Sequence, residues 1–140
     1  MENDQGFFFA VGKLHRRIAK EFGQRLTCIG MTQGLAAVMM HLELVGEGSS
    51  QSEIAQSMEV EQPTLVQLIS KLEKQGIIQR KPYPGDRRKS AIYFTAKGKE
   101  LLTRINSIYE STCEQLFDQI DTSQLDQTEQ LLLRMWNMSR

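Results

Sequence analysis

Apolar residues recur at spacings of three and four over most of the chain, which is the period of a helix with one buried face. In the N-terminal segment, residues 7–26, the repeating positions are Phe7, Val11, Leu14, Ile18 and Phe22. A long segment from Thr95 to about residue 119 keeps the same period with Leu101, Ile105, Ile108, Thr112, Leu116 and Ile120. After a break at 121–123, Leu125, Leu132, Met135 and Trp136 predict a last helix toward the C-terminus.

Three shorter helices are predicted between these ends. Thr32 is suited to cap the first of them, which ends at the break Gly46–Ser49. Ser50 and Glu53 form a capping-box pattern at the start of the next helix, because each side chain can accept from a free amide of the first turn. In the third, Pro63 suits the first helical position, and Gly76 suits a left-handed cap at the end.

The apolar residues of this third helix are Leu65, Leu68, Ile69 and Leu72, so its core stripe is one-sided. Segments 77–81 and 91–95 then carry β-forming residues on either side of a loop with Pro82, Pro84 and Gly85, which predicts a hairpin. The expected fold class is α+β, mostly α: a winged helix-turn-helix with long helices at both ends of the chain.

Charge is unevenly distributed, although the chain has 17 basic and 17 acidic residues and no net charge. Residues 62–98 carry a net charge of +6, and each flank, 1–61 and 99–140, carries −3. Such a distribution concentrates positive potential on one surface, which is typical of proteins that bind nucleic acid. A solvated charged face that happens to be basic is the alternative for the charge pattern alone.

The length of 140 residues suits one domain. No apolar run reaches the roughly 20 residues that span a bilayer, so a cytoplasmic protein is expected. The two cysteines and two histidines have no metal-ligand spacing, and the chain shows no Gly-rich phosphate loop and no nucleophile–base–acid set. We therefore expect no enzyme activity, no cofactor and no metal.

The terminal helices are more apolar than a monomer of this size requires. Phe7–Phe9 lie at one end and Leu131–Leu133 with Trp136 at the other, on more than one helical face. Exposed apolar patches of this kind usually mark a subunit interface.

Several ordered motifs resemble the MarR family of bacterial transcription regulators: Ser50–Ala55, Gln62–Val66, Leu72–Arg80, Asp86–Arg88 and Phe94–Gly98. The run Glu61–Val66 is closest to the SlyA branch. The resemblance implies a single domain over 1–140, with a winged helix-turn-helix at about 32–98 and dimerisation helices at about 7–28 and 99–140. It also implies a homodimer that binds a pseudo-palindromic double-stranded DNA site.

The helix after Glu61 is the expected recognition helix. Gln67 is suited to adenine, Val66 to a thymine methyl, and Thr64 to a phosphate or a base. Ser70 fits such a contact and a plain surface position equally well. The face lacks the arginine that related recognition helices often carry near Gln67, which favours an A·T-rich target. The expected contacts on this helix are Gln62, Pro63, Thr64, Val66, Gln67, Ser70 and Lys71.

In the hairpin, Arg87, Arg88 and Lys89 follow a turn and can extend beyond the protein. The resemblance implies that Arg88 enters the minor groove and that Asp86 pairs with an arginine. A carboxylate on a DNA-facing loop weakens binding unless it orients a cation, which makes this pairing physically sensible.

The resemblance also implies a crevice for an aromatic acid effector, for which His15, Arg16 and Thr32 are the candidate residues. A plain interface histidine is the alternative for His15, and a passive thiol is the alternative to a redox role for Cys28. The competing function is a winged-helix protein-interaction module or an antagonist of other DNA-binding proteins.

Overall fold

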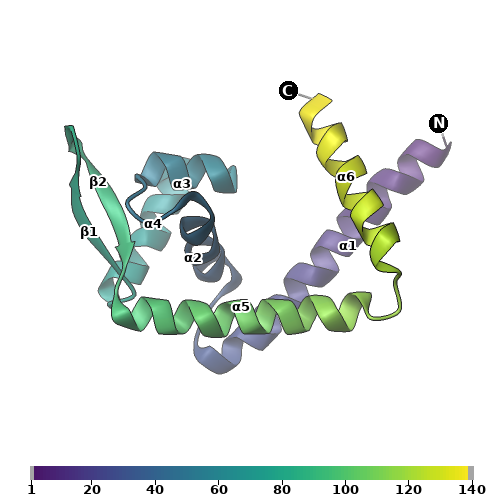
Figure 1. Cartoon of the computed structure of the whole chain (residues 1–140), viewed down its shortest axis with the longest axis horizontal. Coiled ribbons are helices and arrows are strands. Elements are labelled where there is room, and N and C mark those ends of the chain that lie inside the picture. The colour runs from purple at the N-terminus through teal and green to yellow at the C-terminus, as the bar shows by residue number, and fades with distance from the viewer. Residues whose placement is uncertain (1, 139–140) are drawn as a thin grey trace.

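The computed structural model describes residues 2–138 as a mostly helical chain with one β-hairpin (Figure 1). A short 3₁₀ turn, Thr27–Ile29, follows the first helix. The elements are α1 (Glu2–Leu26), α2 (Gln33–Val45), α3 (Gln51–Met58), α4 (Gln62–Lys74), β1 (Ile78–Tyr83), β2 (Asp86–Phe94), α5 (Ala96–Phe117) and α6 (Thr122–Met138). The fold is the expected winged helix flanked by long terminal helices.

Each predicted N-terminal cap is confirmed. The Thr32 hydroxyl accepts from the amide of Leu35 at 3.3 Å. The Ser50 hydroxyl accepts from the amide of Glu53 at 3.3 Å, and the Glu53 carboxylate accepts from the amide of Ser50 at 2.8 Å. These local hydrogen bonds satisfy amides that a helix start leaves free, and this is why short sequence patterns were enough to locate the starts.

Three predicted boundaries were wrong. The first helix begins at Glu2 rather than near Phe7, and α4 begins at Gln62, so Pro63 is its second residue. Strand β1 extends to Tyr83 and β2 begins at Asp86, whereas a loop was predicted between residues 81 and 91. Pro82 does not end β1, because a two-stranded ribbon leaves one edge of each strand without a ladder partner and a proline is tolerated there.

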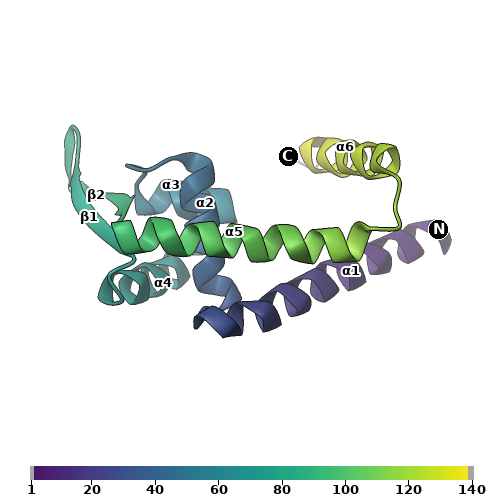
Figure 2. The same cartoon turned by 60° about the horizontal axis from the view of Figure 1, so that its bottom comes forward.

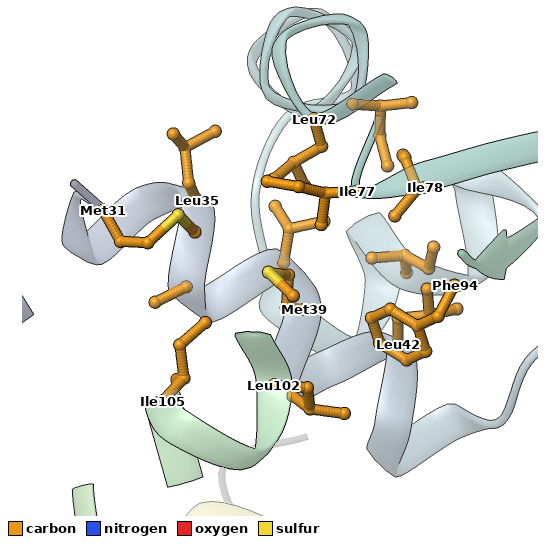
Figure 3. Close-up of a cluster of buried hydrophobic side chains, with 14 of the residues drawn as sticks. Met31, Leu35, Met39, Leu42, Leu72, Ile77, Ile78, Phe94, Leu102 and Ile105 are labelled. Atoms are coloured by element: carbon orange, nitrogen blue, oxygen red, sulfur yellow. The ribbon is translucent and has the colours of Figure 1, made fainter. Parts of the chain in front are cut away.

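The hydrophobic core lies where α2, α3 and α4 meet the base of the hairpin and the first half of α5. Met39, Leu42, Leu72 and Ile105 are fully buried there, and Figure 3 shows side chains of α4, the hairpin base and α5 around α2. The second half of α5 runs along α1, where the rings of Phe22 and Tyr109 meet edge to face at 5.4 Å. One long helix therefore spans both halves of the molecule.

The hairpin stands at one end of the molecule, and the free ends of α1 and α6 lie at the other (Figures 1 and 2). Backbone hydrogen bonds between Ile92 of β2 and the loop before α3, from Gly48 to Ile92 at 2.8 Å and from Ile92 to Ser49 at 2.9 Å, hold the hairpin base. No residue of α6 between Thr122 and Met138 is buried. The ends of the chain therefore carry apolar helices that this one chain does not cover.

Within residues 2–138, no single helix has the length and apolarity to cross a membrane; α1 and α2 pass such a test only as a pair bent by 94°.

The end of α4 and the start of α5 are in direct contact. The Thr95 hydroxyl lies 2.5 Å from the carbonyl oxygen of Gly76 and accepts from the amide of Gly98 at 3.0 Å. The Lys97 ammonium donates to the carbonyl of Gln75 at 2.7 Å. A Cβ atom on Gly98 would overlap the carbonyl oxygen of Ile77. This junction, formed by 75–77 and 95–98, holds the chain that follows α4 next to the first turn of α5.

Gly98→Ala should therefore lower the free energy of unfolding by about 2–3 kcal/mol, because the added methyl group has to displace backbone. Gly23→Ala is the matched control, since Gly23 lies inside α1 with nothing within 4 Å of the added carbon. That control should be neutral or stabilise the protein by up to about 1 kcal/mol, because alanine favours the helix. Urea unfolding of both variants measures the difference, and equal effects would contradict the close approach.

Candidate nucleic-acid interface

Helix α4 presents one buried and one exposed face. Leu65, Ile69 and Leu72 are buried, as the apolar spacing predicted. Of the expected DNA contacts on this helix, Ser70 is half-buried and the others are exposed, namely Gln62, Pro63, Thr64, Val66, Gln67 and Lys71. The exposed face thus combines amide, hydroxyl and small apolar side chains along one helix.

The tip of the hairpin contains a wide bulge. Cα pairing runs regularly from Ile78↔Phe94 to Pro82↔Ser90 and then jumps to Tyr83↔Asp86. Residues 87–89 of β2 therefore face no partner residue on β1. Arg87, Arg88 and Lys89 occupy these three positions, and all are exposed. We call residues 87–89 the cationic bulge.

Asp86 orders the cationic bulge. Its Oδ1 atom accepts from the Arg88 amide at 2.9 Å and lies 3.5 Å from Arg88 Nε. The Arg88 side chain is nevertheless 92% exposed, so its guanidinium extends into solvent. The predicted pairing of Asp86 with an arginine is present in this geometry, and the partner is Arg88. An exposed pair contributes little to stability, so its main effect is on the orientation of the arginine.

Further polar residues join the hairpin to the helices, and the sequence analysis did not single them out. Arg80 Nε donates to Glu73 Oε2 at 3.1 Å, and the amide oxygen of Gln51 faces Arg80 Nη1 at 2.6 Å. A hollow of about 320 Å³ between the hairpin and the starts of α3 and α4 is lined by Ser50, Gln51, Ser52, Gln62, Arg80, Arg88, Lys89 and Ser90. Their sequence spacing gave no signal, because they meet only when the hairpin folds back over α3.

Tyr83 makes a second link between the hairpin and α3. Its hydroxyl donates to Glu53 Oε1 at 3.2 Å. This hydrogen bond and the negative charge of Glu53 raise the pKa of the Tyr83 hydroxyl, which therefore remains the proton donor.

The candidate effector residues do not form one site in the described chain. His15 and Arg16 are exposed on α1 and line a largely apolar groove of about 1020 Å³ between α1 and α6. Thr32 caps α2 and is not part of that groove. The sequence could not reveal this separation, because it depends on the path of α1 past α6. Cys28 is exposed in the 3₁₀ turn, and Cys113 of α5 is partly buried.

Comparison with known proteins gives consistent results. A family model described as MarR family matches residues 45–90, from the end of α2 into β2. The chain is 33% identical to the transcriptional regulator PA3341, over 94% of this chain and 96% of that one, with a TM-score of 0.85. It is 20% identical to MepR from S. aureus, solved as a DNA complex, over 96% of both chains with a TM-score of 0.84.

A third solved structure is CouR from Rhodococcus jostii RHA1 bound to p-coumaroyl-CoA. It is 21% identical over 92% of this chain and 90% of that one, with a TM-score of 0.83. The match to PA3341 is consistent with the fold, with the recognition-type helix α4 and with the ordered cationic bulge. The chain belongs to the MarR family of transcription regulators.

Proposed function

We propose that this chain acts in the cytoplasm, on the DNA of the nucleoid, as a homodimeric regulator that binds a pseudo-palindromic, A·T-rich operator. The observation that carries the proposal is the pairing of two reading elements: the exposed face of α4 and the cationic bulge ordered by Asp86. The DNA-bound state of MepR, which shares the fold, supports it. The exposed residues 62–64, 66, 67 and 71 of α4, the half-buried Ser70, and residues 86–89 form the proposed DNA interface.

In this proposal, α4 lies in the major groove. Gln67 is exposed and can present its amide to an adenine, and exposed Val66 suits a thymine methyl. The contacting face of α4 carries no arginine, the side chain that reads guanine most often. These three features favour A·T base pairs.

The cationic bulge is proposed to enter the adjacent minor groove. A narrow A·T-rich minor groove has an enhanced negative potential, which attracts an inserted arginine. Arg88 fits this role because its backbone amide and its Nε atom face Asp86 while the side chain extends into solvent. Selection of bound sequences from a random duplex pool tests this preference directly.

The dimer is proposed to form through α1 and α6. Phe8 is 74% exposed and Leu133 is 53% exposed, which is unusual for large apolar side chains on a soluble chain. The groove between α1 and α6 is lined by Phe7, Phe8, Phe9, Val11, Gly12, His15, Arg16, Leu131, Leu132 and Met135. A second copy of these helices would remove this surface from water.

We also propose an aromatic acid effector; the likeness to CouR supports an aromatic ligand, since that structure holds p-coumaroyl-CoA, the CoA thioester of an aromatic acid. The placement of Thr32 away from His15 and Arg16 gives that part of the proposal no support from this chain.

The rival function, a winged helix that binds protein, differs in its salt response. DNA binding through several cations weakens steeply with salt because condensed counterions are released.

Arg88→Ala should weaken operator binding by about 5- to 150-fold, because it removes the minor-groove cation. For Arg88→Ala, the dependence of log affinity on log salt should become shallower by about one for each phosphate contact that is lost. Gln67→Ala should instead change the preference at one base position in each half-site and leave the salt slope nearly unchanged.

Fluorescence anisotropy with the selected duplex at several salt concentrations measures both variants, after circular dichroism has shown that they are folded. Parent-like binding by Arg88→Ala at physiological salt would remove the hairpin from the proposed interface.

Asp86→Ala should weaken DNA binding by about three- to tenfold, which is the loss expected when a charge-assisted hydrogen bond no longer orders an arginine. Charge alone predicts tighter DNA binding by this variant, because the substitution removes an anion from a surface that faces phosphates. The same anisotropy assay decides between the two, and tighter binding would show that Asp86 does not orient Arg88.

Leu132→Glu should dissociate the proposed dimer, because it places a charge in the groove between α1 and α6. Gln130→Glu is the matched control, since this exposed residue lies on the same helix and does not line the groove. Analytical ultracentrifugation should give twice 16.0 kDa for the parent and the control at micromolar concentration. A parent of 16.0 kDa would refute the dimer, and an undissociated Leu132→Glu dimer would exclude the groove as its interface.

A further inference from the structure

The outer part of the hairpin has little backbone pairing of its own. Regular pairing stops at Pro82↔Ser90, where proline has no amide hydrogen to donate. Beyond this point, the only Cα pair in the described chain is Tyr83↔Asp86, next to the turn at Pro84 and Gly85. The ladder therefore does not determine the direction in which the cationic bulge points.

Tyr83 lies between this bulge and α3. Its hydroxyl donates to Glu53 Oε1 at 3.2 Å, and the ammonium of Lys89 lies 5.6 Å from the centre of its ring. The other carboxylate oxygen of Glu53 accepts from the amide of Ser50 at 2.8 Å. The acceptor for the tyrosine is thus already held in place by the capping box, so it acts as an immobile anchor.

Arg80 provides a second link from the same strand, through Glu73 of α4 and Gln51 of α3. Residues three apart on a regular strand point to opposite faces. Arg80 and Tyr83 nevertheless both reach the helices, because the pairing register changes between Pro82 and Tyr83. The irregular register therefore adds a link to α3 close to the tip, beyond the link that Arg80 makes.

We propose that Tyr83 is a positioning residue, which ties the tip of the hairpin to the first turn of α3 and so sets where the cationic bulge stands relative to α4. The proposal rests on the proposed function, since it concerns how Arg88 is presented to DNA. The hydroxyl of Tyr83 is engaged by Glu53, so it acts through Arg88 rather than by contacting DNA itself. In this arrangement, the capping box of α3 also serves as the anchor of the hairpin.

Tyr83→Phe tests the tether, because it removes the hydroxyl and keeps the ring beside Lys89. The matched control is Tyr93→Phe on β2: its ring lies 4.6 Å from the ammonium of Lys81, and its hydroxyl makes no hydrogen bond within residues 2–138. Tyr83→Phe should weaken operator binding about fivefold, which corresponds to the loss of one hydrogen bond. The control should bind like the parent, and both variants should keep the parent melting temperature.

The same substitution in an Arg88→Ala background separates positioning from direct contact. If Tyr83 acts mainly through Arg88, Tyr83→Phe weakens binding much less once the arginine is absent than it does in the parent. Full additivity of the two losses would overturn the proposal, because it would mean that Tyr83 contributes to binding independently. Parent-like affinity of Tyr83→Phe, while Arg88→Ala binds weakly, would overturn it as well.

Hydrogen exchange of the DNA-free protein tests the tether without reference to function. In Tyr83→Phe, the amide of Arg88, which donates to Asp86 at the tip, should exchange about fivefold faster, whereas the amide of Gln79 at the hairpin base should not change. Failure of the parent to bind any duplex would refute the proposed function and with it the positioning of Arg88. Unchanged exchange at the tip would refute the tether itself, whatever the DNA assays give.

Discussion

The contact between the end of α4 and the start of α5 constrains the rest of the structure. The carbonyl of Ile77 lies so close to Gly98 that no side chain fits at that position. Thr95 and Lys97 hold the carbonyls of Gly76 and Gln75 at the same place. The chain leaves this contact at Ile77 and has to return to it at Thr95, so β1 and β2 run antiparallel beside each other.

This junction also joins the two halves of the molecule mechanically. Helix α5 starts at the end of α4, packs on α2, and continues along α1, where Phe22 meets Tyr109. Helix α5 is therefore the element that connects α1 with the end of α4. In the proposed dimer, the distance between the two copies of α4 has to match the spacing of the two operator half-sites.

The tip of the hairpin is ordered by side-chain contacts where regular strand pairing ends. Its three adjacent cations occupy positions without a cross-strand partner, where the backbone can expose them fully. Leaving them without any order would weaken DNA binding, because the conformational freedom of the tip would be lost at that step. Asp86 reduces this freedom within the bulge, and the bond from Tyr83 to Glu53 reduces it between the tip and the body of the protein.

The sequence by itself determined the helices, their caps and the faces of α4, because these depend on residues three or four positions apart. It also indicated the charge concentration, and the family resemblance implied that Asp86 pairs with an arginine; the structure identified that arginine as Arg88. Only the tertiary structure decided that Pro82 lies inside a strand, that residues 87–89 form a bulge, and that Thr32 lies apart from the groove at His15. The contacts from Tyr83 to Glu53 and from Arg80 to Glu73 and Gln51 likewise appear only in the folded chain. They join residues 7 to 30 positions apart, and no local periodicity specifies such a distance; the path of the folded backbone does.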